Sequence, residues 1–258
     1  MPTPGRTKYR AVADELRARI LSGRLAPGSP MASETQLMRE HGVSRNTVRL
    51  AVGMLRAEGL IITEHGRGSY VRPRLPVRRL GSERYKQEAA QITGEDPPTT
   101  SFTADQGIDW SAYRLDKEFR EVAATAGLAD LLAVAPGTPL LERRFVFYAA
   151  DRPQQMSYSY YPLDLVAGTP VADPANEPWP GGNIAQLASI GVTITEVHER
   201  VRARMPLPEE SELLEIAPGV PVLAVTRRML SDGRPVEAAV DIVIPADRCE
   251  LDYRIPLP

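Results

Sequence analysis

The stretch SETQLMREHGVSRNTVRLAVGMLRAEGLIITEHGRGSYV, residues 33–71, decides the fold of the first part of this chain. Ser33 is a good N-cap, and Gln36 three residues later completes a capping box. This pair predicts a helix that runs to about His41, where Gly42 breaks it. The stretch therefore begins with a short helix that ends in a tight turn.

A second helix follows the turn directly. Ser44 is its N-cap, and the helix is expected to run through Arg56 or Glu58. Apolar residues at helical spacing mark its buried side: Val48, Ala51, Val52 and Leu55. Polar and basic residues fill its first turn and a half: Arg45, Asn46, Thr47 and Arg49. This is the helix-turn-helix pattern, and such a second helix fits the major groove of DNA.

The residues after the second helix predict a β-hairpin. Gly59 ends the helix, and two β-prone runs, residues 60–62 and 69–71, flank the segment His65-Gly66-Arg67-Gly68. Glycines at the tip of a hairpin allow close approach to a phosphate backbone, and Arg67 supplies a positive charge. We interpret this hairpin as a wing that contacts DNA beside the second helix.

Taken together, four pieces of the stretch resemble the winged helix-turn-helix of GntR-family bacterial transcription regulators. They are Ser33-Glu34 and the runs 43–49, 55–61 and 66–71. We expect DNA contacts from Tyr9, Ser33, Thr35, Ser44, Arg45, Asn46, Thr47, Arg49, His65, Gly66, Arg67 and Gly68. The family often has arginine where this chain has Thr35, so operator preference is expected to differ there. Solvated surface charge is the alternative for Arg45 and Arg49.

Charge is divided unevenly along the chain. Residues 1–74 carry 13 Lys and Arg against 6 Asp and Glu, whereas the remainder carries 18 against 27. A basic module on an acidic partner is typical of a DNA-binding head on a sensing domain, with chance asymmetry as the alternative. We expect a DNA-binding domain at 1–74, a linker at 75–84, and an effector-binding and dimerisation domain at 85–258.

The composition argues against several classes of protein. Cys249 is the only cysteine, so a disulfide framework within the chain is excluded. The histidines, His41, His65 and His198, are scattered, and we expect neither a metal site nor a cofactor. The sequence has no P-loop or Gly-x-Ser-x-Gly motif, and we expect no catalytic residues. No apolar run reaches membrane-spanning length, so we expect a cytoplasmic protein without membrane contact.

Strand signals dominate the later part of the chain. Residues 99–103 are β-prone, 116–123 are ambiguous between strand and helix, and 124–132 have a helical pattern. The segment 131–141, LLAVAPGTPLL, recurs at 213–223 as LLEIAPGVPVL. A β-rich run with paired arginines and a turn ending in Arg-Pro follow each copy. The repeat predicts a helix end, a strand and a hairpin twice, in an α+β domain with a largely antiparallel sheet.

The later part of the chain resembles the UTRA effector-binding domain, which marks the HutC-type branch of the GntR family. The resemblance rests on these repeats, on the break at Gly191-Val192 and on the ending Arg204-Met205-Pro206. The fold of the UTRA domain is similar to that of chorismate lyase. The resemblance implies a sequence-specific DNA-binding repressor that a small-molecule effector releases from its operator. A homodimer would match a palindromic operator. The alternatives are an enzyme of chorismate-lyase-like fold fused to a DNA-binding head, and a DNA binder that senses no ligand.

Five residues are expected in the effector site: Arg143, Arg144, Ser157, Tyr160 and Asn183. Neighbours on a strand point to opposite faces, so one of the two arginines can point into the domain and anchor an anionic effector. A solvated sheet face is the alternative. A short helix beginning near Asn183 would offer free N–H groups to an anion, and Tyr160 would add an apolar wall. Relatives that sense sugar phosphates differ near Ser157 and Asn183, so we expect a different effector.

Overall fold

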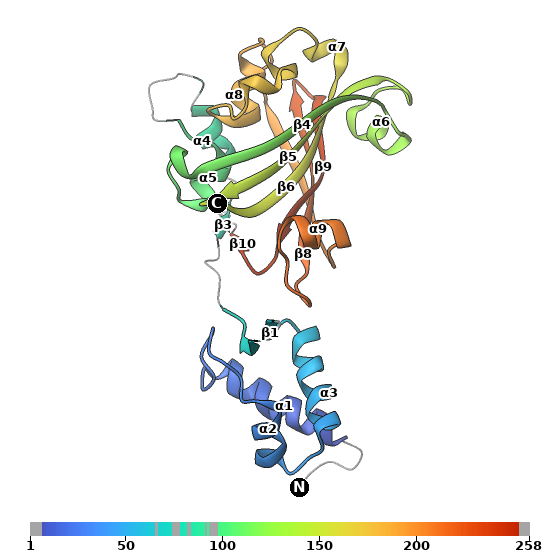
Figure 1. Ribbon diagram of the computed structural model, residues 1–258. Helices are drawn as coiled ribbons and strands as arrows, with labels where there is room; N and C mark the ends of the chain where they lie inside the picture. Colours follow the sequence, from blue (N-terminus) through green and yellow to red (C-terminus); the bar gives the residue numbers. More distant parts are fainter. Residues whose placement is uncertain are drawn as a thin grey trace, which may run out of the picture. The chain divides into compact units, whose positions relative to one another are not determined.

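The computed structural model describes residues 7–64, 67–73, 78–81, 84–90, 92 and 98–252 of the chain. The chain divides into two compact units, one of residues 1–76 with 216–220 and the other of the remaining residues (Figure 1). In the described ranges, no helix is both long and apolar enough to cross a membrane. Each unit has its own hydrophobic core, and the two are described separately.

The N-terminal unit has the predicted winged helix-turn-helix architecture. Its described elements are α1 (Lys8–Leu21), α2 (Glu34–His41), α3 (Arg45–Ala57), β1 (Ile61–Glu64) and β2 (Gly68–Val71). The predicted capping box is confirmed, because Ser33 Oγ accepts the Gln36 backbone N–H at 3.2 Å and Gln36 Oε1 accepts the Ser33 N–H at 2.8 Å. Gly42 has a φ of 59°, which explains why glycine ends α2.

The core of this unit forms where α1, α2 and α3 meet. The predicted stripe of α3 is confirmed for Val48, Ala51 and Leu55, which are fully buried, whereas Val52 is half-buried. They pack with Leu16 and Leu37 and with further residues of the same cluster. The opposite side of α3 is left exposed to solvent, so its polar side chains are available for contact.

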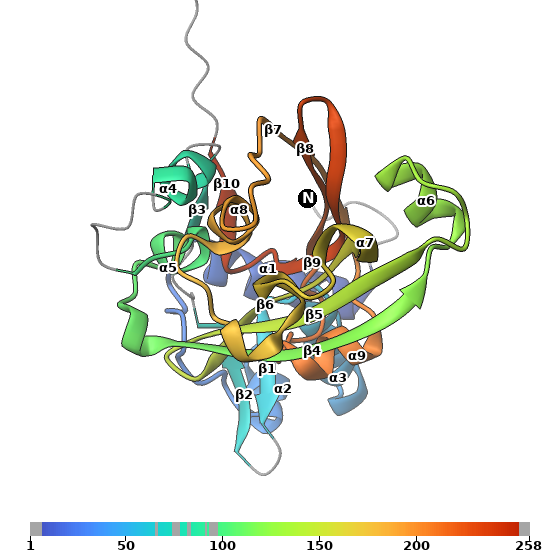
Figure 2. The same ribbon diagram turned by 90° about the horizontal axis from the view of Figure 1, so that it is seen from above.

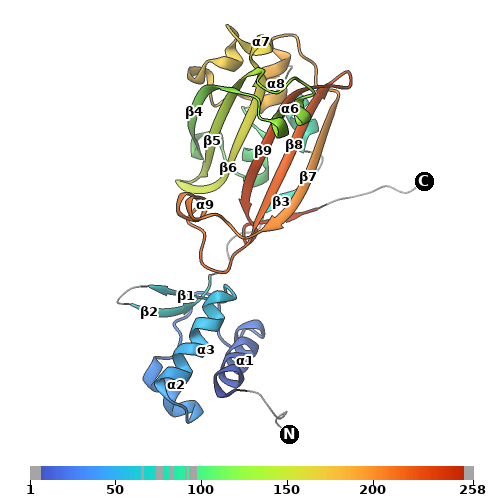
Figure 3. The ribbon, with the colours of Figure 1, turned by 90° about the vertical axis from the view of Figure 1, so that its right-hand side faces the viewer.

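A six-stranded antiparallel sheet forms the centre of the C-terminal unit. Figure 3 shows its strands side by side in the order β4-β5-β6-β9-β8-β7. They are β4 (Tyr113–Ala123), β5 (Pro139–Ala149), β6 (Arg152–Pro162), β7 (Glu196–Arg204), β8 (Val222–Ser231) and β9 (Arg234–Pro245). The ambiguous segment 116–123 is therefore part of a strand, because it pairs along its whole length with β5.

The internal repeat of the sequence is also a repeat of the structure. The first copy comprises α6 (Ala126–Leu132) and the hairpin β5–β6, and the second comprises α9 (Pro208–Leu213) and the hairpin β8–β9. The two hairpins meet at the centre of the sheet through β6 and β9. The predicted order of helix, strand and hairpin is thus confirmed in both copies.

Helices cover the two faces of the sheet unequally. One face packs against α6, in a cluster that includes Leu128, Leu140 and Tyr160. The other face, called the pocket face below, packs against α7 (Leu163–Val166) and α8 (Gly182–Ala188), in a cluster that includes Leu141 and Tyr161. Figure 2 shows α8 grouped with α4 (Arg84–Ala90) and α5 (Ser101–Gln106), apart from α6. Consecutive residues 140 and 141 thus point to opposite faces, as the alternation of a strand requires.

One expectation about this unit is wrong. Residues 99–103 do not form a strand, because Thr100 caps α5 and its Oγ1 accepts the Thr103 N–H at 3.1 Å. Burial of Phe102 on the ring of Phe147, with centroids 5.2 Å apart, favours the helix over the local β propensity. Within the residues expected as the linker, β3 (Arg78–Leu80) pairs in parallel with β10 (Cys249–Leu251).

Candidate DNA interface and effector pocket

The start of α3 presents an exposed basic surface. Ser44 caps the helix, and its Oγ accepts the Thr47 backbone N–H at 3.3 Å. The side chains of Arg45 and Arg49 are 64% and 71% exposed, and Asn46 beside them is exposed as well. Both arginines lie only loosely against Glu34, at 3.6 and 3.9 Å. Loose exposed pairs contribute little to stability, so these guanidinium groups can exchange the carboxylate for phosphates or base edges.

The wing carries a second exposed positive charge. The side chain of Arg67 is 74% exposed and pairs with Glu64 at 2.8 Å. The Tyr70 hydroxyl donates to the Arg67 backbone carbonyl at 3.1 Å, which fixes the backbone of Arg67 beside β2. Gly68 has a φ of 105°, a conformation that glycine adopts without strain. The expected contacts at positions 65 and 66 lie outside the described residues.

The remaining predicted DNA contacts lie on the helix starts. Ser33 and Thr35 are exposed at the start of α2, and Ser44 shares a 2.9 Å hydroxyl contact with Thr47. Tyr9 is half-buried in the first turn of α1, within the described N-terminal unit. The serine hydroxyls already act as caps, so their hydroxyl groups are only partly available to DNA.

One group of potential metal ligands occurs among the described residues. Glu15, Glu40 and His41 bring their ligand atoms within 4.8 Å of one another. Arg19 lies between the two carboxylates and pairs with both, at 2.6 Å and 2.7 Å. The guanidinium therefore supplies the positive charge that these carboxylates need, and we assign no metal to the group.

A polar pocket of about 70 Å³, called the polar pocket below, lies on the pocket face of the sheet. It brings together three of the five predicted effector residues, Arg143 from β5, Ser157 from β6 and Asn183 from α8. Arg227 of β8 lines the same pocket. Three strands and a helix thus converge on a single set of hydrogen-bonding groups.

Arg143 is the most deeply placed of these groups. It is completely buried, and its guanidinium carbon lies 4.8–5.4 Å from the ring centroids of Phe119, Phe145 and Tyr161. Its Nη1 donates to Gln186 Oε1 at 2.7 Å, and its Nη2 donates to the carboxylate of Glu177. Among the described residues, its Nε–H has no acceptor. A buried cation is tolerated here because a carboxylate, an amide and aromatic faces surround it.

The structure does not bring Arg144 and Tyr160, the other two residues expected in the effector site, into the polar pocket. Both lie on the opposite face of the sheet. Arg143 pairs with Ser159 across β5 and β6, so these two side chains share the pocket face. Arg144 and Tyr160 each follow one of them by one residue, and successive side chains of a strand point to opposite faces. Arg144 is 29% exposed at its side chain and lies 3.4 Å from Glu209. The Tyr160 hydroxyl donates to Glu142 at 2.8 Å, within the α6 side of the core.

The second arginine pair is divided between the faces in the same way. Arg227 lies on the pocket face and donates to Glu237 Oε1 at 2.7 Å. Arg228 lies on the opposite face, with its Nη2 3.1 Å from His198 Nδ1. Strand alternation, read from the sequence, correctly predicted that each pair would be divided.

Besides Glu177, the charged residues Arg84, Glu88 and Asp105 of the polar pocket were not predicted from the sequence. Burial raises the pKa of Glu88, which accepts the Ser101 backbone N–H at 3.1 Å. At Gly182, the first residue of α8, a Cβ would lie 2.8 Å from Glu88 Oε1. The side chain of Glu88 therefore occupies the space at the start of α8 where the effector's anion was expected. The sequence signal for them was the i, i+4 spacing of residues 84 and 88, which places both side chains on one face of a helix.

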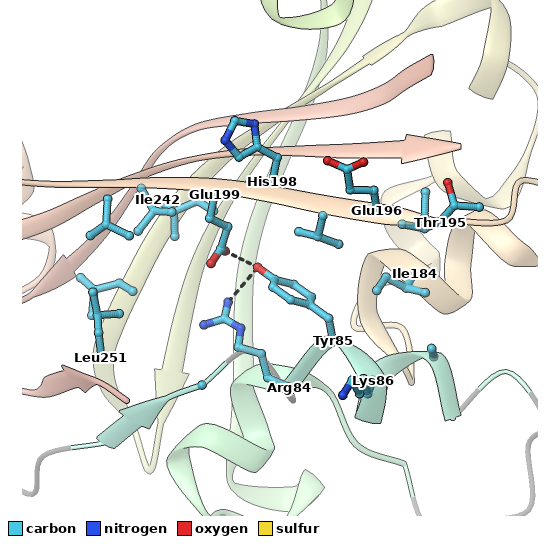
Figure 4. Close-up of a pocket in the computed structure, with 17 residues that line it drawn as sticks. Arg84, Tyr85, Lys86, Ile184, Thr195, Glu196, His198, Glu199, Ile242 and Leu251 are labelled. Atoms are coloured by element: carbon cyan, nitrogen blue, oxygen red, sulfur yellow. Dashed lines mark hydrogen bonds between the residues drawn. The ribbon is translucent and has the colours of Figure 1, made fainter. Parts of the chain in front are cut away.

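A larger cavity of about 610 Å³, called the apolar cavity below, lies between α4 and β7 and extends to β8, β9 and β10 (Figure 4). At its inner end, the Tyr85 hydroxyl donates to Glu199, and Arg84 Nη2 lies 3.4 Å from the same hydroxyl. Figure 4 shows these three side chains converging between the helix and the strand. Arg84 and Ile242 line both this cavity and the polar pocket.

Comparison with known proteins agrees with this architecture. Residues 8–71 match the bacterial regulatory proteins of the gntR family, and residues 117–250 match the UTRA domain. An HTH-type transcriptional regulator of Streptomyces coelicolor is 30% identical over 244 residues, covering 93% of this chain and 89% of its own length. The histidine utilization repressor of Pseudomonas putida is 28% identical over 249 residues, covering 95% and 91%. A crystal structure of a GntR-family transcriptional regulator matches with a TM-score of 0.68 at 32% identity, over 98% of this chain and 99% of that chain.

The fold and the two sites define a DNA-binding transcription regulator with a winged-helix head and an effector-binding domain built on an antiparallel sheet. The chain belongs to the GntR family, in the HutC-type branch that carries a UTRA domain. This family and the relatives found are transcription regulators, so the alternative of a chorismate-lyase-like enzyme is not supported.

Asp105 makes the stability of the C-terminal unit depend on pH. Burial raises its pKa to about 7, an effect that Arg84 opposes and that Glu88 and Glu199 reinforce. Between the unfolded pKa of 3.8 and about 7, the folded protein holds a proton that the unfolded chain has lost. The stabilising contribution of this group is thus fully present below the unfolded pKa and lost as pH rises through 7.

We therefore expect Asp105→Asn to flatten the decline in unfolding free energy between pH 4 and 7 by up to about 1.4 kcal/mol per pH unit. Urea unfolding followed by tryptophan fluorescence measures this, because Trp110 and Trp179 both lie in the C-terminal unit. An unaltered pH profile in the variant would show that Asp105 titrates normally in the folded protein.

Proposed function

We propose that this protein is a cytoplasmic homodimeric repressor that leaves its operator when a small anionic effector binds in the polar pocket. Residues 1–74 would bind DNA, and residues 85–258 would bind the effector and dimerise, with residues 75–84 joining them. Several relatives support repression by name, including the mannosyl-D-glycerate transport/metabolism system repressor of Escherichia coli, which is 28% identical over 230 residues. An effector regulates only if it favours a state of the dimer that binds DNA less well.

The observation that carries the effector assignment is the completely buried guanidinium of Arg143 at the polar pocket. Its Nε–H and the Nε–H of Arg84 have no acceptors within the described residues, and buried donors without partners are costly. An anionic group would satisfy these donors. Because Arg143 already pairs with Glu177, the effector's anion must share or displace that carboxylate, which limits the site to strong acceptors such as carboxylate or phosphate.

The DNA-binding role of α3 and the wing leads to a prediction about specificity. Arg45→Ala or Arg49→Ala is expected to cost about 1–3 kcal/mol of operator binding if the side chain reads a base. Arg67→Ala should weaken specific and random DNA about equally, because a wing arginine contacts phosphates. Fluorescence anisotropy on both DNAs separates these effects. Full operator affinity in both the Arg45 and the Arg67 variants would contradict the proposed interface.

The homodimer leads to a prediction about mass. The full chain of 28.3 kDa is expected to elute at about twice that mass in size-exclusion chromatography with light scattering. A fragment of residues 1–75 should be monomeric and bind DNA weakly, because bivalency raises the effective concentration of the second head. A monomeric full-length protein that still binds a palindromic operator tightly would contradict the proposal.

A further inference from the structure

The polar pocket is small for a whole effector. Its volume is about 70 Å³, whereas ligand pockets usually measure about 300–1,000 Å³. The groups that line it are largely polar or charged, and its two buried arginines are each held by a carboxylate, Arg143 by Glu177 and Arg227 by Glu237. This space accommodates one anionic group, so the remainder of a larger effector must lie elsewhere.

The apolar cavity adjoins the polar pocket and has the required size. Its volume of about 610 Å³ lies within the usual range for a ligand site. Arg84 belongs to the wall between the two, because it lies 3.4 Å from Asp105 on the polar side and 3.4 Å from the Tyr85 hydroxyl on the apolar side. Ile242 is the other residue that lines both spaces.

One side of the larger space is suited to an uncharged hydrocarbon surface, while Arg84, Lys86, Glu196, His198 and Glu199 line the rest of it. Six apolar side chains from β7, β8, β9 and β10 line it: Val197, Val201, Val225, Ile242, Ile244 and Leu251. Burying an apolar group against such walls is favourable in proportion to the area removed from water. The Nε–H of the wall residue Arg84 has no acceptor in the described part of the chain, so an anion bound beside it would gain a donor.

We propose that the effector is an amphipathic acid whose anionic group binds at Arg143 and whose apolar body extends past Arg84 into the apolar cavity. This inference rests on the proposed function, because its anionic group is the one assigned to the polar pocket. It adds the chemical class of the rest of the molecule, and it assigns a ligand-binding role to the space between α4 and β7 (Figure 4).

A series of straight-chain carboxylates tests the inference on the full-length protein. Isothermal titration with butanoate, hexanoate, octanoate and decanoate, each below its micellar concentration, should show affinity rising about fourfold per buried methylene group. Decanol, which has the body without the charge, should bind at least tenfold more weakly than decanoate. Affinity that does not rise with chain length, or decanol that binds as well as decanoate, would overturn the inference.

A pair of variants on one strand localises the body of the ligand. Val197→Trp narrows the apolar cavity and should reduce the gain with chain length while leaving butanoate binding unchanged. Arg200→Trp, an exposed position on the other side of β7, should behave as the wild type. Equal chain-length gains in both variants would place the body elsewhere and overturn the inference.

A third variant separates this inference from the proposed function. Arg143→Gln should weaken all four carboxylates and inorganic phosphate to a similar extent, because they share the anion site. Phosphate binding that depends on Arg143 without any binding of decanoate would leave the proposed function intact and overturn the amphipathic acid. Butanoate and phosphate binding unaffected by Arg143→Gln would instead overturn the proposed function.

Discussion

Arg143→Ala is expected to lower the unfolding free energy of the C-terminal unit by about 3–5 kcal/mol and to abolish effector binding. The guanidinium is completely buried, and the side chain of its partner Glu177 is 7% exposed. Removing the arginine leaves a buried carboxylate without its counter-charge, which costs more than losing an exposed pair. Gln186 Oε1 would lose its donor as well.

The neighbouring residue offers a matched control. Arg144 differs from Arg143 by one position, yet its side chain is 29% exposed and its carboxylate partners, Glu118 and Glu209, lie 3.8 and 3.4 Å away. Arg144→Ala should therefore cost no more than about 1 kcal/mol and leave effector binding intact. Urea unfolding followed by tryptophan fluorescence measures both variants. Equal losses in the two would mean that the arginines do not lie on opposite faces.

Leu55→Ala is expected to destabilise the N-terminal unit by about 2–5 kcal/mol and to remove most operator binding. Leu55 is completely buried where α3 packs against the rest of its core, and the substitution leaves a cavity there. A small domain is stable by only about 5–15 kcal/mol, so such a loss approaches its total stability. The unit contains no tryptophan, because both tryptophans lie beyond residue 76. Far-ultraviolet circular dichroism should therefore report an early transition that tryptophan fluorescence does not.

An exposed leucine on the same helix provides the comparison. Leu50 is 49% exposed, and Leu50→Ala should change stability by no more than about 0.5 kcal/mol. The effector-binding domain should remain folded in both variants, since each unit has its own core. A Leu55→Ala protein with an unaltered dichroism transition would show that the predicted core of the head is wrong.

The fold of the head could be predicted because its signals are local. Ser33 and Ser44 cap helices through their own side chains, and Gly42 ends a helix by adopting a left-handed conformation. The repeat in the C-terminal domain was equally readable, because two copies of one pattern specify two copies of one arrangement. Residues 99–103 were misassigned because a cap at Thr100 and the burial of Phe102 outweighed local β propensity.

The effector pocket could be predicted only in part, because its geometry depends on contacts between distant segments. The alternation of side chains along a strand predicts that Arg143 and Arg144 point to opposite faces of the sheet. It does not predict which of these faces the helices α7 and α8 cover. The pairing register, which places Ser159 opposite Arg143, decides that Tyr160 lies on the other side. The contribution of α4 and α5 was missed because both helices are short and their packing is tertiary.

The most direct test of the proposed mechanism is operator release measured on the two neighbouring arginine variants. A thermal-shift screen of anionic metabolites on the wild-type protein first supplies an effector. Fluorescence anisotropy with operator DNA then follows release as that effector is added. The wild type and Arg144→Ala should release DNA at the same effector concentration, whereas Arg143→Ala, checked to be folded and to bind DNA, should stay bound. Release of Arg143→Ala at the wild-type concentration would contradict an effector site built on Arg143.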